Sequence, residues 1–537
     1  MYEHNHSTEP KTPRERRCGC SSHPHPSSNT EFSPSRRGFL QGVSCSALGA
    51  ALAGLETAPA NAADAALSAA VPGSAPPKGV PLRVKSVLIY QIDQRKEKDS
   101  WRQYGGLTDL GKVNEEATRI ERELKKLASQ ADFAIEALPV ALVDSDQKAE
   151  KVAETDCDVL LIYPAMGSQV HTLATSKIPK VLFLRHKSGP FYRWFEDAHY
   201  RLLRMDGDTF EQPEMDVDDI VVDNYDEVLW RLRALYGLKN AKGTKMLAIG
   251  GLVAYSKLGQ EFGPAHAKDL WNYQFEIISE EEFAKRLEKA RADQSVVAAV
   301  ERQTKELLAQ PNVTLVTERK FVFNSLMALW VTKELMKETG ATNFGFGRCM
   351  EHKVISMLDT PPCLVLSLAN DEGYTAYCHT DLTHTVPGVL LRWIAGKPTF
   401  VCNALFPHEG IFTVAHCQAP RKMNGKDYEA AKIMTHYESD YGAAVKVDYP
   451  KGQLVTVIIP NLHCTKWQGF RGKIIDSPSL PACRSQMDIE IDGNWRKLLA
   501  NMQGFHTQVC YGDYLREVGY ALKKLKKIEW ENFSEPV

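Results

Sequence analysis

Residues 245–251 read KMLAIGG, a short apolar run that ends in two glycines. A run of this kind is typical of a buried parallel strand that leads through a tight turn into a helix. The two glycines could also cradle a phosphate, but the spacing G-x-G-x-x-G of a dinucleotide site is lacking, so the turn is the simpler interpretation. Helical spacing of apolar residues over 280–308 and 324–337, followed by a strand pattern over 343–347, extends this α/β unit.

The same alternation precedes this segment. A charged helix pattern over 114–130 separates the first two of four short strand patterns rich in Val, Ile and Leu. Continuous apolar strands that alternate with helices indicate a parallel sheet that is covered on both faces. The four strand patterns are 84–90, 158–163, 180–184 and 220–222.

After Pro361 and Pro362 the pattern changes, because short strand patterns now follow one another with few helices between them. Two helices are still expected, over 381–395, where Thr380 or Asp381 could form the cap, and over 511–526. The turn-forming residues 449–452 predict a hairpin between the last two strands. The strand patterns are 364–368, 375–378, 399–401, 412–415, 443–447 and 454–459.

These patterns together predict three domains. Two N-terminal α/β domains with Rossmann-like parallel sheets occupy 81–243 and 244–350. A β-rich α+β C-terminal domain occupies 351–537. The stretch from residue 81 is long enough for two to four domains at ~100–200 residues each.

The N-terminus has the pattern of an export signal. Arg36 and Arg37 precede an apolar stretch over 42–55, and Ala60-Asn61-Ala62 matches a small-x-small cleavage site. The stretch is shorter than the ~20 apolar residues of a membrane span, and the paired arginines indicate the twin-arginine route. The prediction is a twin-arginine signal peptide over 1–62 and a linker over 63–80. The protein is thus expected to interact with the twin-arginine translocase and to function in the periplasm or otherwise outside the cytoplasm, without a stable membrane anchor.

Composition excludes some classes of function. The formal net charge of −2 argues against the large basic field that a nucleic-acid partner requires. No segment after the signal approaches 18 uninterrupted apolar residues, so no membrane span is expected. Nine of the 12 cysteines follow the cleavage site without any close C-x-x-C pair. We interpret them mostly as buried thiols, and one disulfide stays open as an alternative.

Histidines concentrate late in the chain. Of 16 histidines, four lie in the first 25 residues and eight lie between His352 and His506. The C-terminal third is therefore where proton transfer or metal binding is expected, although most single histidines in such a set are surface or satisfied core residues.

A series of motifs in this region resembles the C-terminal region of the L-fucose/L-arabinose isomerase superfamily, especially its fucose-isomerase-like members. The motifs occur in order from Pro361 to Asp513, which is more specific than any one of them. They are PPCL at 361–364, SLANDEG at 367–373, Cys378 with Asp381, GKPTF at 396–400, AHC with Pro420 at 415–420, CRSQ at 483–486, Gly504 with His506, and YGD at 511–513.

The resemblance implies an aldose–ketose isomerase that passes through an enediol and uses a divalent metal, usually manganese. In the family a Glu and an Asp act as metal ligands and as the acid/base pair, and a late His completes the site. The Glu position falls on His379, the Asp position on Asn403 and the late His on His506. His379 and Asn403 are thus the expected catalytic positions, all three are the expected metal ligands, and His416 is expected to bind substrate. The family is also the only ground for expecting a homo-oligomer.

Two of these three positions depart from the family pattern, since His379 and Asn403 carry no negative charge. A neutral His, Asn and His set should hold Mn²⁺ more weakly, while imidazole ligands favour Zn, Ni, Cu or Fe. Asp381, Glu372 or His416 could replace the missing base. Three hypotheses follow: a sugar isomerase or close chemical variant, a sugar-binding protein that has lost its catalytic carboxylates, and a metal enzyme of other carbohydrate chemistry.

Overall fold

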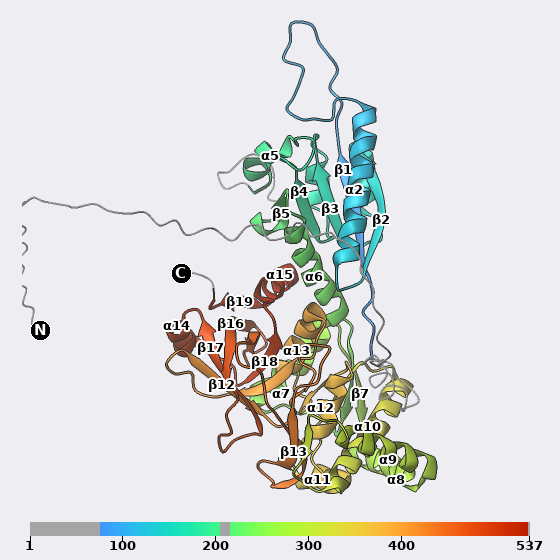
Figure 1. Cartoon of the computed structure of the whole chain (residues 1–537). Coiled ribbons are helices and arrows are strands. Elements are labelled where there is room, and N and C mark those ends of the chain that lie inside the picture. The colour runs from blue at the N-terminus through green and yellow to red at the C-terminus, as the bar shows by residue number, and fades with distance from the viewer. Residues whose placement is uncertain (1–75, 204–214, 535–537) are drawn as a thin grey trace, which may run out of the picture. The chain divides into compact units, whose positions relative to one another are not determined.

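The computed structural model describes residues 76–203 and 215–534, so the predicted signal peptide and most of the predicted linker lie outside the described residues. Within them the fold is a mixed α/β one, with two parallel sheets and an antiparallel C-terminal sheet (Figure 1). None of the described helices is long and apolar enough to cross a membrane.

The first sheet is entirely parallel and has the order β2-β1-β3-β4-β5. Four of its strands confirm the sequence prediction. The fifth, β2, was missed because Pro139 interrupts its pattern and many of its side chains are only partly buried. The strands are β1 (Leu82–Ile89), β2 (Ile135–Val143), β3 (Val159–Pro164), β4 (Lys180–Leu184) and β5 (Ile220–Val222).

Helices connect the strands of this first sheet. The longest, α2 (Leu110–Gln130), begins at Asp109, whose side chain accepts a hydrogen bond from the backbone N–H of Lys112. It packs along β1 and β2 (Figure 1). The other connections are α3 (Asp146–Ala153), α4 (Val170–Ala174), α5 (Trp194–Asp197), η1 (Ala198–Leu203) and η2 (Val217–Asp219). Helix α6 (Tyr225–Ala241) follows β5 and leads from the first sheet to the second.

The second sheet is also entirely parallel and has the order β10-β9-β6-β7. The KMLAIGG segment forms β6 and its turn, in which Gly250 and Gly251 both have positive φ. Strands and helices of this region are β6 (Lys245–Ile249), α7 (Lys257–Trp271), β7 (Gln274–Ile278), α8 (Glu280–Ala292), α9 (Gln294–Leu308), α10 (Arg319–Thr339), β9 (Asn343–Phe346), α11 (His352–Leu358), α12 (Cys363–Asp371) and β10 (Thr375–Cys378).

Three sequence predictions are wrong in this region. The pattern over 364–368 is not a strand but part of α12, because a short apolar run that is buried all round fits a helix as well as a strand. The pattern over 280–308 is two helices, which Asp293 divides by ending α8 and capping α9. Strand β10 was expected among the C-terminal strands, but it pairs in parallel with β9.

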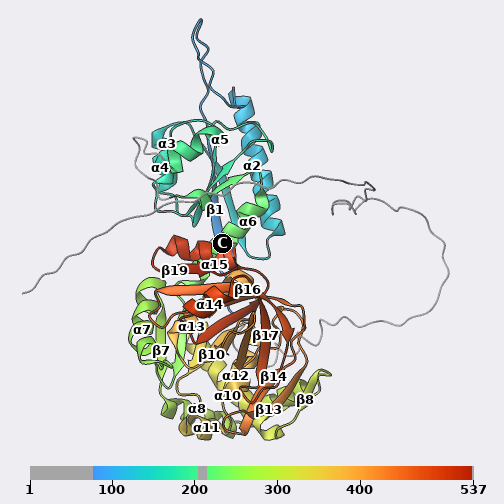
Figure 2. The ribbon, with the colours of Figure 1, turned by 90° about the vertical axis from the view of Figure 1, so that its left-hand side faces the viewer.

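The C-terminal sheet has the order β15-β18-β11-β12-β17-β16-β19, and an additional pairing of β15 with β16 closes it into a barrel-like arrangement (Figure 2). The predicted hairpin at 449–452 is wrong, because β14 and β15 belong to different sheets. A three-stranded sheet has the order β14-β13-β8. The strands are β8 (Val313–Leu315), β11 (Phe400–Ala404), β12 (Ile411–His416), β13 (Ala431–His436), β14 (Tyr441–Val447), β15 (Leu454–Pro460), β16 (Lys466–Asp476), β17 (Ser485–Asp492), β18 (His506–Tyr511) and β19 (Glu529–Asn532).

Helix α13 (Leu382–Ala395) connects the second parallel sheet to the C-terminal sheet and confirms the predicted helix with Asp381 as its N-cap. It packs against β18, α6 and α7. Gly237 of α6 permits the close approach, since a Cβ there would lie 2.3 Å from Cγ1 of Ile394. The remaining helices are α14 (Trp495–Asn501) and α15 (Leu515–Leu525), the latter shorter than predicted because 506–511 belongs to β18.

Candidate functional site

The predicted site residues lie where the carboxyl end of the second parallel sheet meets the C-terminal sheet. The loop 250–256 follows β6, Cys349 follows β9, and His379 and Asp381 follow β10. In open α/β sheets, the carboxyl ends of the strands form the usual ligand-binding edge. Residue His506 begins β18, which α13 covers.

Three side chains at this edge could share one cation: Asp381, His384 and His506. Their candidate ligand atoms lie within 4.8 Å of one another, and all three residues are buried. Asp381 and His384 are three residues apart at the start of α13, a spacing that puts both on one side of the helix. Two imidazoles and one carboxylate suit a borderline divalent metal.

The hydrogen bonding of His384 indicates which of its nitrogens is free to bind. Its Nε2 lies 3.1 Å from the carbonyl oxygen of Cys378, which can only accept, so Nε2 carries the hydrogen. Its Nδ1 is buried and has no hydrogen-bond partner among the described residues. Burial lowers the pKa of His384. His384 is therefore a neutral imidazole whose buried Nδ1 has a lone pair available to a ligand.

Asn403 lies beside His506 on the neighbouring strand. The two residues are directly paired across β11 and β18, so their side chains share one face of the sheet. The Oδ1 atom of Asn403 and the Oε1 atom of Gln508 are buried acceptors without a hydrogen-bond partner among the described residues. Unpaired buried acceptors are costly, and a bound cation or ligand would satisfy them. The residues present thus fit the divalent metal that the family resemblance implies.

His416 has a different arrangement. Its Nδ1 accepts a hydrogen bond from the backbone N–H of Cys417 at 2.9 Å, and its ring lies 6.4 Å from that of His506. Burial, with a smaller contribution from neighbouring imidazoles, lowers the pKa of His416 to about 3. The ring is therefore neutral at pH 7 with its hydrogen on Nε2, which makes it a hydrogen-bond donor rather than a metal ligand.

The structure places His379 with a pair of thiols instead. Its Nδ1 lies 3.9 Å from Sγ of Cys349, which in turn lies 3.1 Å from Sγ of Cys378. These three residues form a second group of candidate ligands. His379 is still near enough to contribute to lowering the pKa of His506, after burial and the closer imidazoles of His384 and His416. Of the three predicted ligands, Asn403 and His506 lie side by side on neighbouring strands. The third, His379, belongs to the group with Cys349 and Cys378 instead.

Sequence reasoning missed His384. The available signal was the Asp-x-x-His spacing at the start of the helix, together with Asp381, which was interpreted as a cap. The structure shows that Asp381 does cap α13, because its Oδ1 accepts from the N–H of Thr383 at 2.9 Å. The cap position is what holds the carboxylate beside His384.

An aromatic side chain from the loop after β6 borders the site. Tyr255 stacks on Phe505 with ring centroids 4.8 Å apart and meets the ring of His506 edge-on at 5.4 Å. Its backbone N–H donates to Oδ2 of Asp381 at 3.0 Å, so the carboxylate also holds the loop. The side chain is 61% exposed and offers an aromatic surface to solvent beside the buried cluster.

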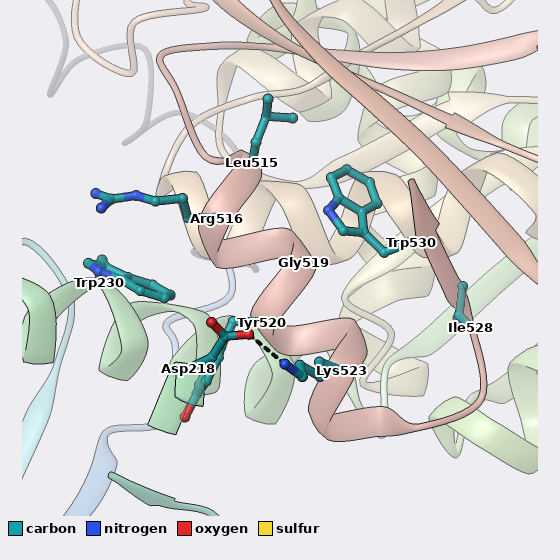
Figure 3. Close-up of a pocket in the computed structure, with 9 residues that line it drawn as sticks. All are labelled: Asp218, Trp230, Leu515, Arg516, Gly519, Tyr520, Lys523, Ile528 and Trp530. Carbon is teal, nitrogen blue, oxygen red and sulfur yellow. Dashed lines mark hydrogen bonds and ion pairs between the residues drawn. The ribbon is translucent and has the colours of Figure 1, made fainter. Parts of the chain in front are cut away.

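A separate pocket of about 530 Å³ lies away from this cluster, between η2 and α6 on one side and α15 and β19 on the other (Figure 3). Its charged groups are already paired. Lys523 lies 2.5 Å from Asp218, and Arg516 lies 3.2 Å from Glu227. Because these charges are satisfied within the fold, the Asp381, His384 and His506 cluster is the stronger candidate for a binding site.

A scan against protein-family models finds no match to the chain, and a search of curated proteins finds none. The resemblance to the isomerase superfamily therefore rests on the motifs quoted above alone.

Proposed function

We propose that this protein is a metal-dependent enzyme of carbohydrate chemistry that moves a proton between adjacent carbons of an aldose or ketose. Asp381, His384 and His506 would hold one divalent cation. The observations that carry the proposal are the convergence of their candidate ligand atoms within 4.8 Å of one another and the buried, unpaired Nδ1 of His384. When bound, the cation would polarise the carbonyl and hydroxyl oxygens of the sugar.

The chain's own residues would divide the remaining work. Asp381 supplies the carboxylate that the His379 and Asn403 positions lack, and it serves as both ligand and base, as the family carboxylates do. The Nε2–H of neutral His416 would donate to a sugar oxygen, and the amide of Asn403 would orient a second one. The aromatic surface of Tyr255 would border the ring of the sugar.

The family metal is manganese, but the ligand set here differs. One carboxylate and two imidazoles carry a single negative charge, where the family carries two, so we expect Zn²⁺, Fe²⁺, Ni²⁺ or Cu²⁺ to bind more tightly than Mn²⁺. Metal analysis of the purified chain tests this point. Less than one-tenth of an equivalent after loading with manganese or zinc would contradict the proposal.

A second function is favoured by one observation. The carboxylate of Asp381 already accepts hydrogen bonds from the N–H and hydroxyl of Thr383 and from the N–H of Tyr255. A carboxylate used only in this structural way would leave a sugar-binding protein without catalysis. Incorporation of solvent deuterium at C1 or C2 of bound sugars distinguishes the two functions, because only the enzyme exchanges these hydrogens.

The variant Asp381→Asn sharpens this experiment. Asn is as good an N-cap as Asp, so α13 should keep its start while the site loses its base. We expect deuterium exchange to fall by about 10²–10⁴-fold, the usual contribution of a general base. Exchange at the parental rate would show that Asp381 is not the base.

The proposal includes export as a folded, metal-loaded protein through the twin-arginine translocase, on the grounds of Arg36 and Arg37. A metal could then be inserted in the cytoplasm before transport. The variant R36K/R37K should remain in the cytoplasm, which fractionation of cells that produce the full chain would measure. Transport of that variant at the parental level would contradict this route.

A further inference from the structure

A second cluster of ligand atoms lies beside the proposed catalytic site and has a different chemistry. Cys349, Cys378 and His379 offer two thiols and an imidazole nitrogen within 4.8 Å of one another. The two sulfur atoms are 3.1 Å apart, well beyond a disulfide bond of about 2.0 Å, and both residues are free cysteines. Both cysteines are buried, at 1% and 5% exposure.

The backbone is specially shaped to bring these three side chains together. Successive residues of a strand point to opposite faces, so Cys378 at the end of β10 and His379 after it would normally face apart. His379 instead adopts a left-handed conformation with φ +58°, which turns its ring toward Cys349. A non-glycine residue in this region costs free energy that the surroundings must offset.

Gly345 makes room for that turn. A Cβ at Gly345 would lie 2.5 Å from the carbonyl oxygen of His379, so β9 can pass this close only because the residue has no side chain. Cys349, which follows β9, reaches the end of β10 across the same pair of parallel strands. The cluster is therefore positioned by two adjacent strands and a glycine contact rather than by a loose loop.

We propose that Cys349, Cys378 and His379 form a second cation site, one that takes a thiophilic ion such as Zn²⁺. Soft thiolate ligands with an imidazole select zinc over manganese. Two Zn–S bonds of about 2.3 Å at a tetrahedral angle span about 3.8 Å, so the sulfur atoms need to separate by only about 0.7 Å. Three protein donors leave a fourth position for water or another small ligand.

A cation at this second site would restrain the segment from Cys378 to His384, which contributes two residues to the first site. Cys378 and His379 lie just before Asp381 and His384, and the carbonyl of Cys378 accepts the Nε2–H of His384. A cation on the thiols would fix that carbonyl and so the orientation of His384, as outer-sphere groups do at other metal sites. The cluster itself does not depend on the proposed function of the first site.

Zinc titration of the full chain under reducing conditions tests the proposal. We expect the double variant Cys349→Ser and Cys378→Ser to bind one equivalent of Zn²⁺ less than the parent protein. Cys510→Ser, which removes a buried thiol outside the cluster, should keep the parental stoichiometry. Equal zinc content in the parent and the double variant would overturn the proposal.

A measurement on the parent protein covers the case in which the double variant fails to fold. Zinc should slow alkylation of Cys349 and Cys378 by N-ethylmaleimide at least tenfold, and peptide mapping separates them from the other thiols. Unchanged alkylation of both residues would overturn the proposal. The variant His384→Gln should keep this protection, so that loss of the first site and loss of the second are told apart.

Discussion

The carboxyl ends of the two parallel sheets form comparable edges, but they differ in whether the buried polar groups there have partners within the fold. At the first sheet, Arg185 follows β4 and is fully buried, with Nε 2.5 Å from Glu116 and Nη2 2.5 Å from Glu123. Asp223, after β5, accepts the N–H groups of three consecutive residues, 186–188. The charged groups of Arg185 and Asp223 at this edge are therefore paired within the fold.

At the second sheet, the corresponding edge leaves binding capacity unused. The Nδ1 of His384 and the Oδ1 of Asn403 are buried without a hydrogen-bond partner among the described residues, and two thiols and an imidazole converge nearby. His379 also sits in a left-handed conformation. Groups that cost stability unless something binds them indicate a site, whereas groups that satisfy one another indicate architecture. The type of sheet edge alone therefore does not identify a site.

The largest expected effect concerns the first edge. Arg185→Met keeps much of the side-chain volume but removes the buried cation from the buried Glu116 and the partly buried Glu123. We expect a loss of about 3–5 kcal/mol in the free energy of unfolding, the usual cost of breaking a buried ion pair from one side. Urea denaturation measures it, with zinc and manganese binding expected to stay parental.

Arg83→Met is a matched control, because Arg83 pairs with Asp156 at the surface and should leave stability nearly unchanged. A loss below about 1 kcal/mol for Arg185→Met would mean that the first edge is not architectural in this sense.

The second effect concerns metal binding at the other edge. His384→Gln removes the unpaired Nδ1, and we expect metal affinity at the first site to fall by at least about 100-fold, since even outer-sphere changes cost 10–100-fold. Isothermal titration with Zn²⁺ and Mn²⁺ measures it. His416→Gln is the comparison variant, because the Nδ1 of His416 is already used by Cys417. Equal losses in the two variants would contradict the assignment of donor and ligand.

A smaller effect is expected at Gly345. In Gly345→Ala the new Cβ would meet the carbonyl oxygen of His379, and overpacking of this kind costs about 1–3 kcal/mol. Thermal unfolding measures the loss, and zinc protection of Cys349 should weaken with it. Gly340→Ala is the control for backbone strain without a steric clash, since φ at Gly340 is +71° but a Cβ there would meet no atom within 4 Å. Parental stability and zinc protection in Gly345→Ala would show that the close approach is not required.

The smallest expected effect is a pH dependence at the first edge. Burial alone would raise the pKa of Asp223, but hydrogen bonds from Ser188, His186 and Lys187 outweigh it and lower the pKa to about 2. Because the folded pKa lies below the unfolded one, the stabilisation is present above about pH 4 and is lost as the pH falls through 2.

Asp223→Asn should therefore cost about 1–2 kcal/mol at pH 7, less than the full shift because the side chain is partly exposed. The difference from the parent should shrink between pH 4 and pH 2, which denaturation at a series of pH values would measure. A constant difference over that range would contradict the assignment.

The amino-acid sequence was enough to predict four of the five strands of the first sheet and strands β6 and β9 of the second, because apolar period and turn residues are local properties. It did not predict β2 or β7. It also predicted the helix over 381–395 with Asp381 as a candidate cap, and the structure confirms both. It could not determine that 364–368 is helical, since a run buried all round has no period to distinguish helix from strand.

The tertiary structure alone decided which donors meet. The convergence of His384 with His506 depends on α13 packing over β18, a contact between segments far apart in the chain. His379 points toward Cys349 because its own backbone is left-handed and because Gly345, on the neighbouring strand, leaves room for its carbonyl oxygen. The unpaired Nδ1 of His384 depends on a carbonyl that accepts from its other nitrogen. The first two depend on non-local contacts, which sequence spacing does not encode. The third joins residues only six apart, but it needs the turn between β10 and α13 that the fold imposes.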